Sequence, residues 1–130
     1  MRRAAAYLSV AALWLMCSCG AEISLRKGDQ SYALGEYQDA AAKYKKAYTG
    51  ISPKEKELRG STAFKLGESY HRINYVPRAL AAYQNAVRYK YPDSIVYRHL
   101  ADMQRYSGKL KDAEKNYQIA LAYDPDDRLA

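Results

Sequence analysis

The sequence contains few of the residues that carry covalent or metal chemistry. Among 130 residues there are only two cysteines and two histidines. There is no glycine-rich phosphate loop, no Ser-His-Asp order and no H-E-x-x-H motif. These absences predict that the protein is not an enzyme, and that it has no catalytic, cofactor-binding or metal residues.

Aromatic residues other than tyrosine are also scarce. One Phe and one Trp stand against fourteen Tyr. Because a tyrosine ring can pack while its hydroxyl stays hydrated, tyrosine suits half-buried positions. The composition therefore favours thin helical layers over a thick apolar core.

The charge balance is basic, with 21 Lys and Arg against 14 Asp and Glu, a net charge of +7. Such a charge is compatible with nucleic acid, acidic lipid or an acidic protein as a partner. However, basic and acidic residues are interleaved, as in KEKELR, and no nucleic-acid-binding motif is present. The charges predict a solvated surface and no nucleic-acid partner.

The N-terminus reads as a targeting segment. Arg2 and Arg3 precede an uncharged, largely apolar run from Ala4 to Ser18. A membrane-spanning helix needs about 20 apolar residues, so this shorter run fits a signal peptide better than an anchor. Residues 1–18 are predicted to be a signal peptide outside the fold.

Both cysteines lie at the end of this run, in LMCSCG. A disulfide between residues two apart would be strained, and a C-x-C pair alone cannot complete a metal site. The segment resembles a bacterial lipoprotein signal, although Met16 and Cys17 depart from the usual pattern. The resemblance implies lipidation of Cys19, a short linker over 19–22, and a lipid-anchored protein at the outer membrane facing the periplasm. Ordinary secretion with free thiols remains an alternative.

Three segments of equal length repeat along the rest of the chain, over residues 21–54, 60–93 and 94–127. Repeat position eight is small, and position fifteen is Gly or Asn, which suits a left-handed helix end. Position twenty-four is always Tyr, predicted to pack against the following repeat. The small residues at position eight predict close approach of two antiparallel helices. They are Gly28, Gly67 and Ala101.

These columns resemble the tetratricopeptide repeat. The resemblance implies an all-α, right-handed solenoid of three helix-turn-helix repeats with a concave groove. Residues 64–94 further resemble the N-terminal module of PorE-like outer-membrane lipoproteins of Bacteroidetes. Those proteins add a propeller and an OmpA-like domain, and some serve type IX secretion.

The resemblance also places groove residues, because the family lines its concave surface from fixed positions of each first helix. Among them, Arg72, Arg98 and Arg105 are predicted to form a basic patch. The three acids at position nine are predicted to form an acidic row, which comprises Asp29, Glu68 and Asp102. Leu25 and Asp29 replace the first two residues of the clamp that related modules use for chaperone C-termini, so that activity is not carried over. His71 and His99 are interpreted as groove or surface histidines. The predicted groove comprises Asp29, Tyr32, Phe64, Glu68, His71, Arg72, Arg98, Asp102, Arg105 and Tyr106.

Two boundaries depart from a regular array. Five extra residues precede the second repeat, where Ser52, Pro53 and Glu55 suit a helix start, so one long helix is predicted from Pro53 to Ile73. Residues 128–130 look like the truncated start of a further helix. The last complete helix would then leave Tyr117 and Leu121 on an uncovered face, open to a partner, to a second copy or to more of a longer chain.

Taken together, these features predict a non-catalytic, lipid-anchored periplasmic scaffold. It would bind a peptide or partner protein through the groove or through the open C-terminal face. The alternative is a structural subunit of an outer-membrane or secretion assembly, held by repeat stacking without peptide recognition.

Overall fold

The computed structural model describes residues 19–123, which form six helices and no strand. The first helix covers residues 19–33. The others are α2 (Tyr37–Gly50), α3 (Lys56–Arg72), α4 (Val76–Arg88), α5 (Ile95–Tyr106) and α6 (Leu110–Tyr123). The predicted signal peptide, the end of the third repeat and residues 128–130 lie outside the described residues.

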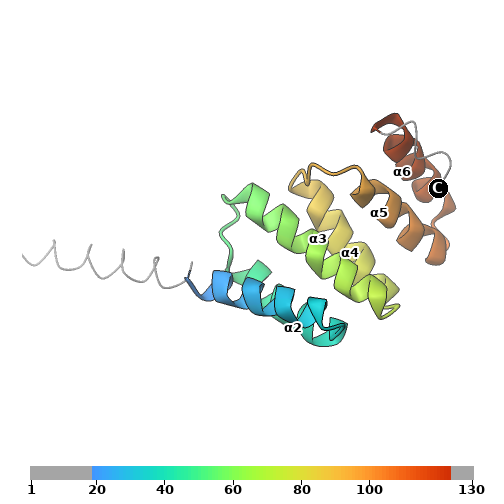
Figure 1. Cartoon of the computed structure of the whole chain (residues 1–130). Helices are drawn as coiled ribbons and strands as arrows, with labels where there is room; N and C mark the ends of the chain where they lie inside the picture. The colour runs from blue at the N-terminus through green and yellow to red at the C-terminus, as the bar shows by residue number, and fades with distance from the viewer. Residues whose placement is uncertain (1–18, 124–130) are drawn as a thin grey trace, which may run out of the picture.

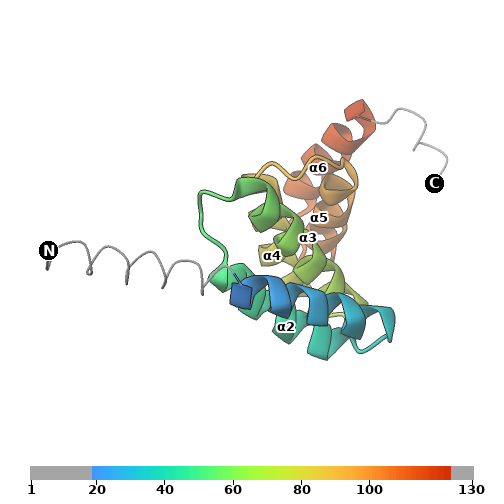
Figure 2. The same cartoon turned by 60° about the vertical axis from the view of Figure 1, so that its left-hand side comes forward.

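The helices form three hairpins that follow one another in chain order (Figure 1, Figure 2). α2 packs on α3, α3 on α4, α4 on α5 and α5 on α6. This arrangement is the predicted solenoid of helix-turn-helix repeats. No helix within residues 19–123 combines the length and the apolar character needed to cross a membrane.

Each hairpin turns at repeat position fifteen, as predicted. Gly35, Asn74 and Gly108 have φ angles of +77°, +55° and +75°. The left-handed conformation there lets the next amide bond back to the helix: the Glu36 N–H donates to the Ser31 carbonyl at 2.9 Å. That bond satisfies a carbonyl that the helix end would otherwise leave unpaired.

Close packing inside the hairpins depends on the small residues at position eight. A Cβ added to Gly28 would lie 2.7 Å from the ring of Tyr44, and one added to Gly67 would lie 2.7 Å from the ring of Tyr83. Since real Cβ atoms do not approach other atoms so closely, the tyrosine rings occupy the space that the glycines leave. The third repeat uses the fully buried Ala101.

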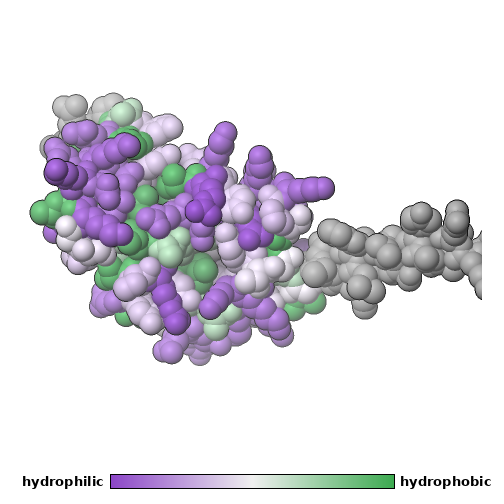
Figure 3. Space-filling view, turned by 180° about the vertical axis from the view of Figure 1, so that it is seen from behind, coloured by the Kyte–Doolittle hydropathy of each residue, from purple (hydrophilic) through white to green (hydrophobic). Residues whose placement is uncertain are grey.

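A single core runs through the stack. Alanines at positions twenty and twenty-seven are buried in every repeat, and α5 adds Val96, Leu100 and Met103. Seen from behind, polar and charged side chains cover much of the surface, with hydrophobic side chains between them (Figure 3). The protein therefore has the thin, helical layers that its composition predicted.

The long helix that leads into the second repeat begins later than predicted. α3 starts at Lys56, three residues after Pro53, and ends at Arg72. The residues expected to cap it form a turn instead: the Glu55 N–H donates to the Ser52 carbonyl at 3.0 Å, and the Ser52 N–H donates to the Glu55 carboxylate at 3.2 Å. These two bonds close a turn in the segment between α2 and α3, and the helix begins only after Glu55.

The extra turn of α3 still has a structural role. Its Arg59 guanidinium lies 4.4 Å from the ring centroid of Tyr48 and 5.3 Å from that of Tyr89. The same side chain donates to the carbonyl of Ile51 at 2.6 Å. Cation–π contacts and this hydrogen bond tie α2, the connection and the end of α4 together.

Candidate functional site

The acidic row at repeat position nine is bonded to the tyrosines at position twenty-four. The Tyr44 hydroxyl donates to Asp29 at 2.6 Å, and the Tyr83 hydroxyl donates to Glu68 at 2.6 Å. In the third repeat the Tyr117 hydroxyl donates to Asp102. Each repeat thus fixes one carboxylate with a hydroxyl from its own second helix.

The following repeat contributes a second group to two of these carboxylates. Lys65 Nζ lies 2.8 Å from Asp29, and His99 Nδ1 lies 2.6 Å from Glu68. Both contributing residues occupy repeat position six. The tyrosine rings face these same residues, since Tyr83 lies 5.6 Å from His99 between ring centroids. Tyr44 and Tyr83 therefore contact the next repeat, as predicted, and also support the acidic row.

These contacts shift the acidity of the carboxylates. Burial raises the pKa of the Glu68 carboxyl, but the hydrogen bonds with His99 and Tyr83 lower it by more, so it lies below its usual range. The same balance holds at Asp29, where Lys65 and Tyr44 outweigh burial and leave the pKa lowered. Both side chains are consequently carboxylates at neutral pH.

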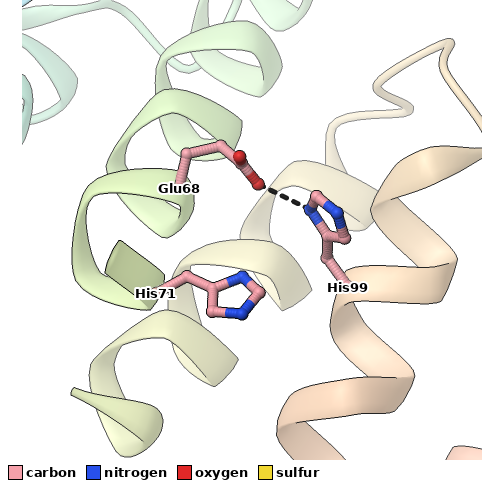
Figure 4. A group of neighbouring side chains, drawn as sticks. All are labelled: Glu68, His71 and His99. Atoms are coloured by element: carbon pink, nitrogen blue, oxygen red, sulfur yellow. Dashed lines mark hydrogen bonds and ion pairs between the residues drawn. The ribbon is translucent and has the colours of Figure 1, made fainter. Parts of the chain in front are cut away.

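Glu68, His71 and His99 form a cluster between α3 and α5 (Figure 4). One possible ligand atom from each lies within 4.8 Å of the other two. His71 Nδ1 is 3.1 Å from the Tyr83 hydroxyl. Burial, and then the neighbouring His99, lower the pKa of His71, which favours its neutral form.

A stacked aromatic wall holds the His99 ring in place. Phe64 lies parallel to Tyr91, with 4.4 Å between centroids and 10° between planes. The Phe64 ring also stacks with the His99 ring, with 6.1 Å between centroids and 9° between planes. His99 is also largely buried, with 16% of its side chain exposed. Its imidazole is thus fixed against Glu68 by packing as well as by the hydrogen bond.

A hollow of about 350 Å³ adjoins this cluster on the side of the first repeat. Its lining combines carboxylates, one lysine and aromatic rings. Such a surface offers charge, hydrogen bonds and apolar contact to an elongated ligand. It is lined by Asp29, Tyr32, Ala33, Tyr44, Phe64, Lys65 and Glu68.

Comparison with known proteins identifies the fold. The chain matches the first tetratricopeptide domain of Spaghetti (RPAP3), solved with an HSP90 peptide, over 84% of this chain and 82% of that one, with a TM-score of 0.70 and 21% identity. This is a tetratricopeptide-repeat fold. The C-terminal domain of a putative FK506-binding protein of Plasmodium falciparum matches over 85% and 80%, with a TM-score of 0.76 and 19% identity.

A third tetratricopeptide domain, from Arabidopsis FLU, covers 82% of this chain and 96% of its own, with a TM-score of 0.72 and 20% identity. No family model and no curated protein sequence matches the chain. At these identities the similarity defines the tetratricopeptide-repeat fold alone.

The structure brings together part of the predicted groove. Asp29, Tyr32, Phe64 and Glu68 line the hollow, and His71 joins Glu68 and His99. Tyr106 is mostly exposed at the other end of α5, where Asp102 lies one turn earlier. These residues therefore form a series along the first helices of the tetratricopeptide repeats.

The arginines of the predicted basic patch lie on two helices, α3 and α5. The Arg72 guanidinium lies 5.7 Å from the ring centroid of Tyr37, on α2. The Arg105 guanidinium lies 4.8 Å from that of Tyr106, on its own helix α5, which also carries Arg98. Arg72 and Arg105 thus each lie against an aromatic ring.

The residues of the predicted open C-terminal face, Tyr117 and Leu121, lie on α6. Tyr117 is half-buried and its hydroxyl is bonded to Asp102, because position twenty-four points toward the first helix of its own repeat. Leu121 is 36% exposed, as expected, and Leu110 and Tyr123 are more exposed still. The exposed apolar side chains Leu110 and Leu121 therefore share one face of α6, whereas the Tyr123 ring stacks on Tyr97 of α5.

Sequence reasoning missed the Glu68–His71–His99 cluster. One signal was present: ESYH places Glu68 and His71 three residues apart, on one face of a helix. The contribution of His99 was not visible, because it depends on how α5 packs beside α3.

Proposed function

We propose that this chain is a non-catalytic, lipid-anchored scaffold of the bacterial envelope that binds an extended peptide or partner protein in its groove. The hollow between the first helix and α3 carries this proposal. Its mixture of fixed charges and aromatic rings suits main-chain and side-chain recognition of an elongated peptide. Peptide binding by the first domain of Spaghetti (RPAP3) supports this use of the fold.

The lining residues explain how such a peptide would be held. The Asp29 carboxylate is fixed by Tyr44 and Lys65, so it need not reorganise on binding. Lys65 keeps 40% of its side chain exposed, and Tyr32 is half-buried beside it. A peptide carboxylate near Lys65 and an apolar side chain against Tyr32 and Phe64 would use both kinds of group.

The groove is tested with peptides selected from a random library on the purified chain. We expect Lys65→Glu to weaken their binding about tenfold or more, because it places a second carboxylate beside Asp29 and loses at least about 1.4 kcal/mol. Lys45→Glu is the matched control, with the same change of charge at an exposed position of α2 outside the hollow. Equal affinities for both variants, measured by calorimetry, would count against the groove.

The lipid anchor is proposed from the sequence around Cys19, which is an exposed free cysteine at the start of the first helix. We expect mass spectrometry of the protein from bacterial membranes to show a mature chain that begins at Cys19 and carries acyl groups. Cys19→Ser should abolish this modification. A chain that retains Met1 and an unmodified Cys19 would contradict the anchor and the placement at the outer membrane.

A second candidate function is a structural subunit of an outer-membrane assembly such as a type IX secretion apparatus. The exposed Leu110 and Leu121 on one face of α6 favour it, because such side chains are usually covered in a repeat array. In this case the purified chain should associate with rising concentration in sedimentation experiments, and Leu121→Glu should prevent the association. A chain that stays monomeric would argue for the scaffold instead.

A further inference from the structure

We propose that Glu68, His71 and His99 form a binding site for a zinc-type transition metal ion at the junction of the second and third repeats. The site would use two imidazole nitrogens and one carboxylate oxygen. One such atom from each residue already lies within 4.8 Å of the other two. All three side chains point into the space between α3 and α5 (Figure 4).

The fold brings these ligands together in two ways. Glu68 and His71 share one face of α3 because they are three residues apart. α5 then places His99 Nδ1 at 2.6 Å from the Glu68 carboxylate. Around a tetrahedral zinc ion the ligand atoms would be about 3.4 Å apart. Binding would therefore separate the Glu68 and His99 ligand atoms by about 0.8 Å and would close any other pair by no more than about 1.4 Å.

The donor set selects the class of ion. Imidazole nitrogen with carboxylate oxygen suits Zn²⁺, Co²⁺, Ni²⁺ and Cu²⁺, whereas Mg²⁺ and Ca²⁺ prefer oxygen ligands throughout. Three protein ligands leave at least one coordination position for water or for an acidic group of a bound partner.

The surrounding residues support the three ligands. The Tyr83 hydroxyl donates to Glu68 at 2.6 Å and lies 3.1 Å from His71 Nδ1, so it contacts two of the three. The His99 ring is stacked on Phe64. Groups that orient ligands in this way strengthen metal binding, and their loss commonly weakens it about 10- to 100-fold.

The junction between the first and second repeats provides an internal control. It has the same carboxylate–tyrosine pair, Asp29 and Tyr44, but Lys65 stands at the position of His99. Tyr32 stands at the position of His71. Because Lys65 pairs with Asp29 at 2.8 Å, a lysine at position six is compatible with this packing. His99→Lys should therefore keep the fold and remove a metal ligand.

The test uses the untagged full chain with Cys17→Ser and Cys19→Ser, so that thiols cannot bind the ion, titrated with cobalt(II) chloride. We expect one equivalent to bind, with the visible absorption of a low-coordinate cobalt site, and Zn²⁺ to displace it while Mg²⁺ does not. His99→Lys and His71→Tyr should abolish this binding, Asp29→Asn should leave it unchanged, and Tyr83→Phe should weaken it about 10- to 100-fold.

Circular dichroism of each variant confirms that the helices are retained. Two results would overturn the proposal. One is the absence of saturable cobalt binding by the parent chain. The other is binding that persists unchanged in both His99→Lys and His71→Tyr, which would place the ion elsewhere.

Discussion

Replacing Tyr83 with Ala is expected to lower the free energy of unfolding by about 3–5 kcal/mol, the usual cost of removing a buried aromatic side chain. Tyr83 is completely buried and is the largest of the fully buried side chains in the described part of the chain. Its ring fills the space over Gly67, and its hydroxyl bonds to Glu68. The substitution would leave a cavity at the centre of the stack and would remove one of the two hydrogen bonds of the Glu68 carboxylate, which keeps its contact with His99.

Urea unfolding monitored by circular dichroism measures this loss. Tyr117→Ala is the matched control, since Tyr117 has the same repeat position and the same bond to an acid but is only half-buried. Its loss should be clearly smaller. Tyr83→Phe separates the hydroxyl from the ring and should cost about 1.5–3 kcal/mol, the range for a hydrogen bond to a charged group. Equal losses for Tyr83→Ala and Tyr117→Ala would contradict the central position of Tyr83.

Gly67→Ala is expected to destabilise the protein by about 1–3 kcal/mol, although alanine is the better helix former. The new Cβ would meet the Tyr83 ring at 2.7 Å, so either the ring or the helix pair must move. The effect should depend on that ring. In the Tyr83→Ala background the same change should cost nothing, or should stabilise by up to about 1 kcal/mol.

Gly20→Ala is the control for this cycle, because a Cβ there meets nothing within 4 Å. It should be neutral or slightly stabilising. If Gly67→Ala proved as harmless as Gly20→Ala in the parent chain, the close approach of α3 and α4 at this point would be wrong. Thermal or urea unfolding of the four chains in the cycle provides the coupling energy.

The fold was predictable from the sequence because its determinants recur. Gly28 and Gly67 predicted close helix packing, and Gly35, Asn74 and Gly108 predicted the turns that their positive φ angles confirm. A single glycine would have been ambiguous. The recurrence of the same residue types at the same repeat positions identified these residues, because each hairpin has the same packing and the same turn.

The start of α3 was not predictable from local signals. Ser52, Pro53 and Glu55 carry the pattern of a helix cap, and their hydrogen bonds do form, but they close a turn before the helix. Cap residues stabilise turns and helix starts through the same bonds. The start at Lys56 accompanies the anchoring of Arg59 between Tyr48 and Tyr89, which depends on tertiary contacts.

The candidate site was predictable in its parts and not in its connections. The acidic row and the tyrosine column were both evident, but the bonds between them require the register of two helices within a repeat. The contacts of Asp29 with Lys65 and of Glu68 with His99 require the register of one repeat on the next. A single sequence gives no information on that register beyond the repeat itself.

We propose that the partner binds in the groove and not at the exposed end of the stack. Photo-cross-linking in bacterial cells tests this claim most directly, with a reactive amino acid placed at position 32 in the hollow, at position 121 on α6, or at position 45 as a background control. We expect one discrete cross-linked product from position 32 and none above background from position 121. A product that forms from position 121 and not from position 32 would contradict the account and favour a subunit held by its end face.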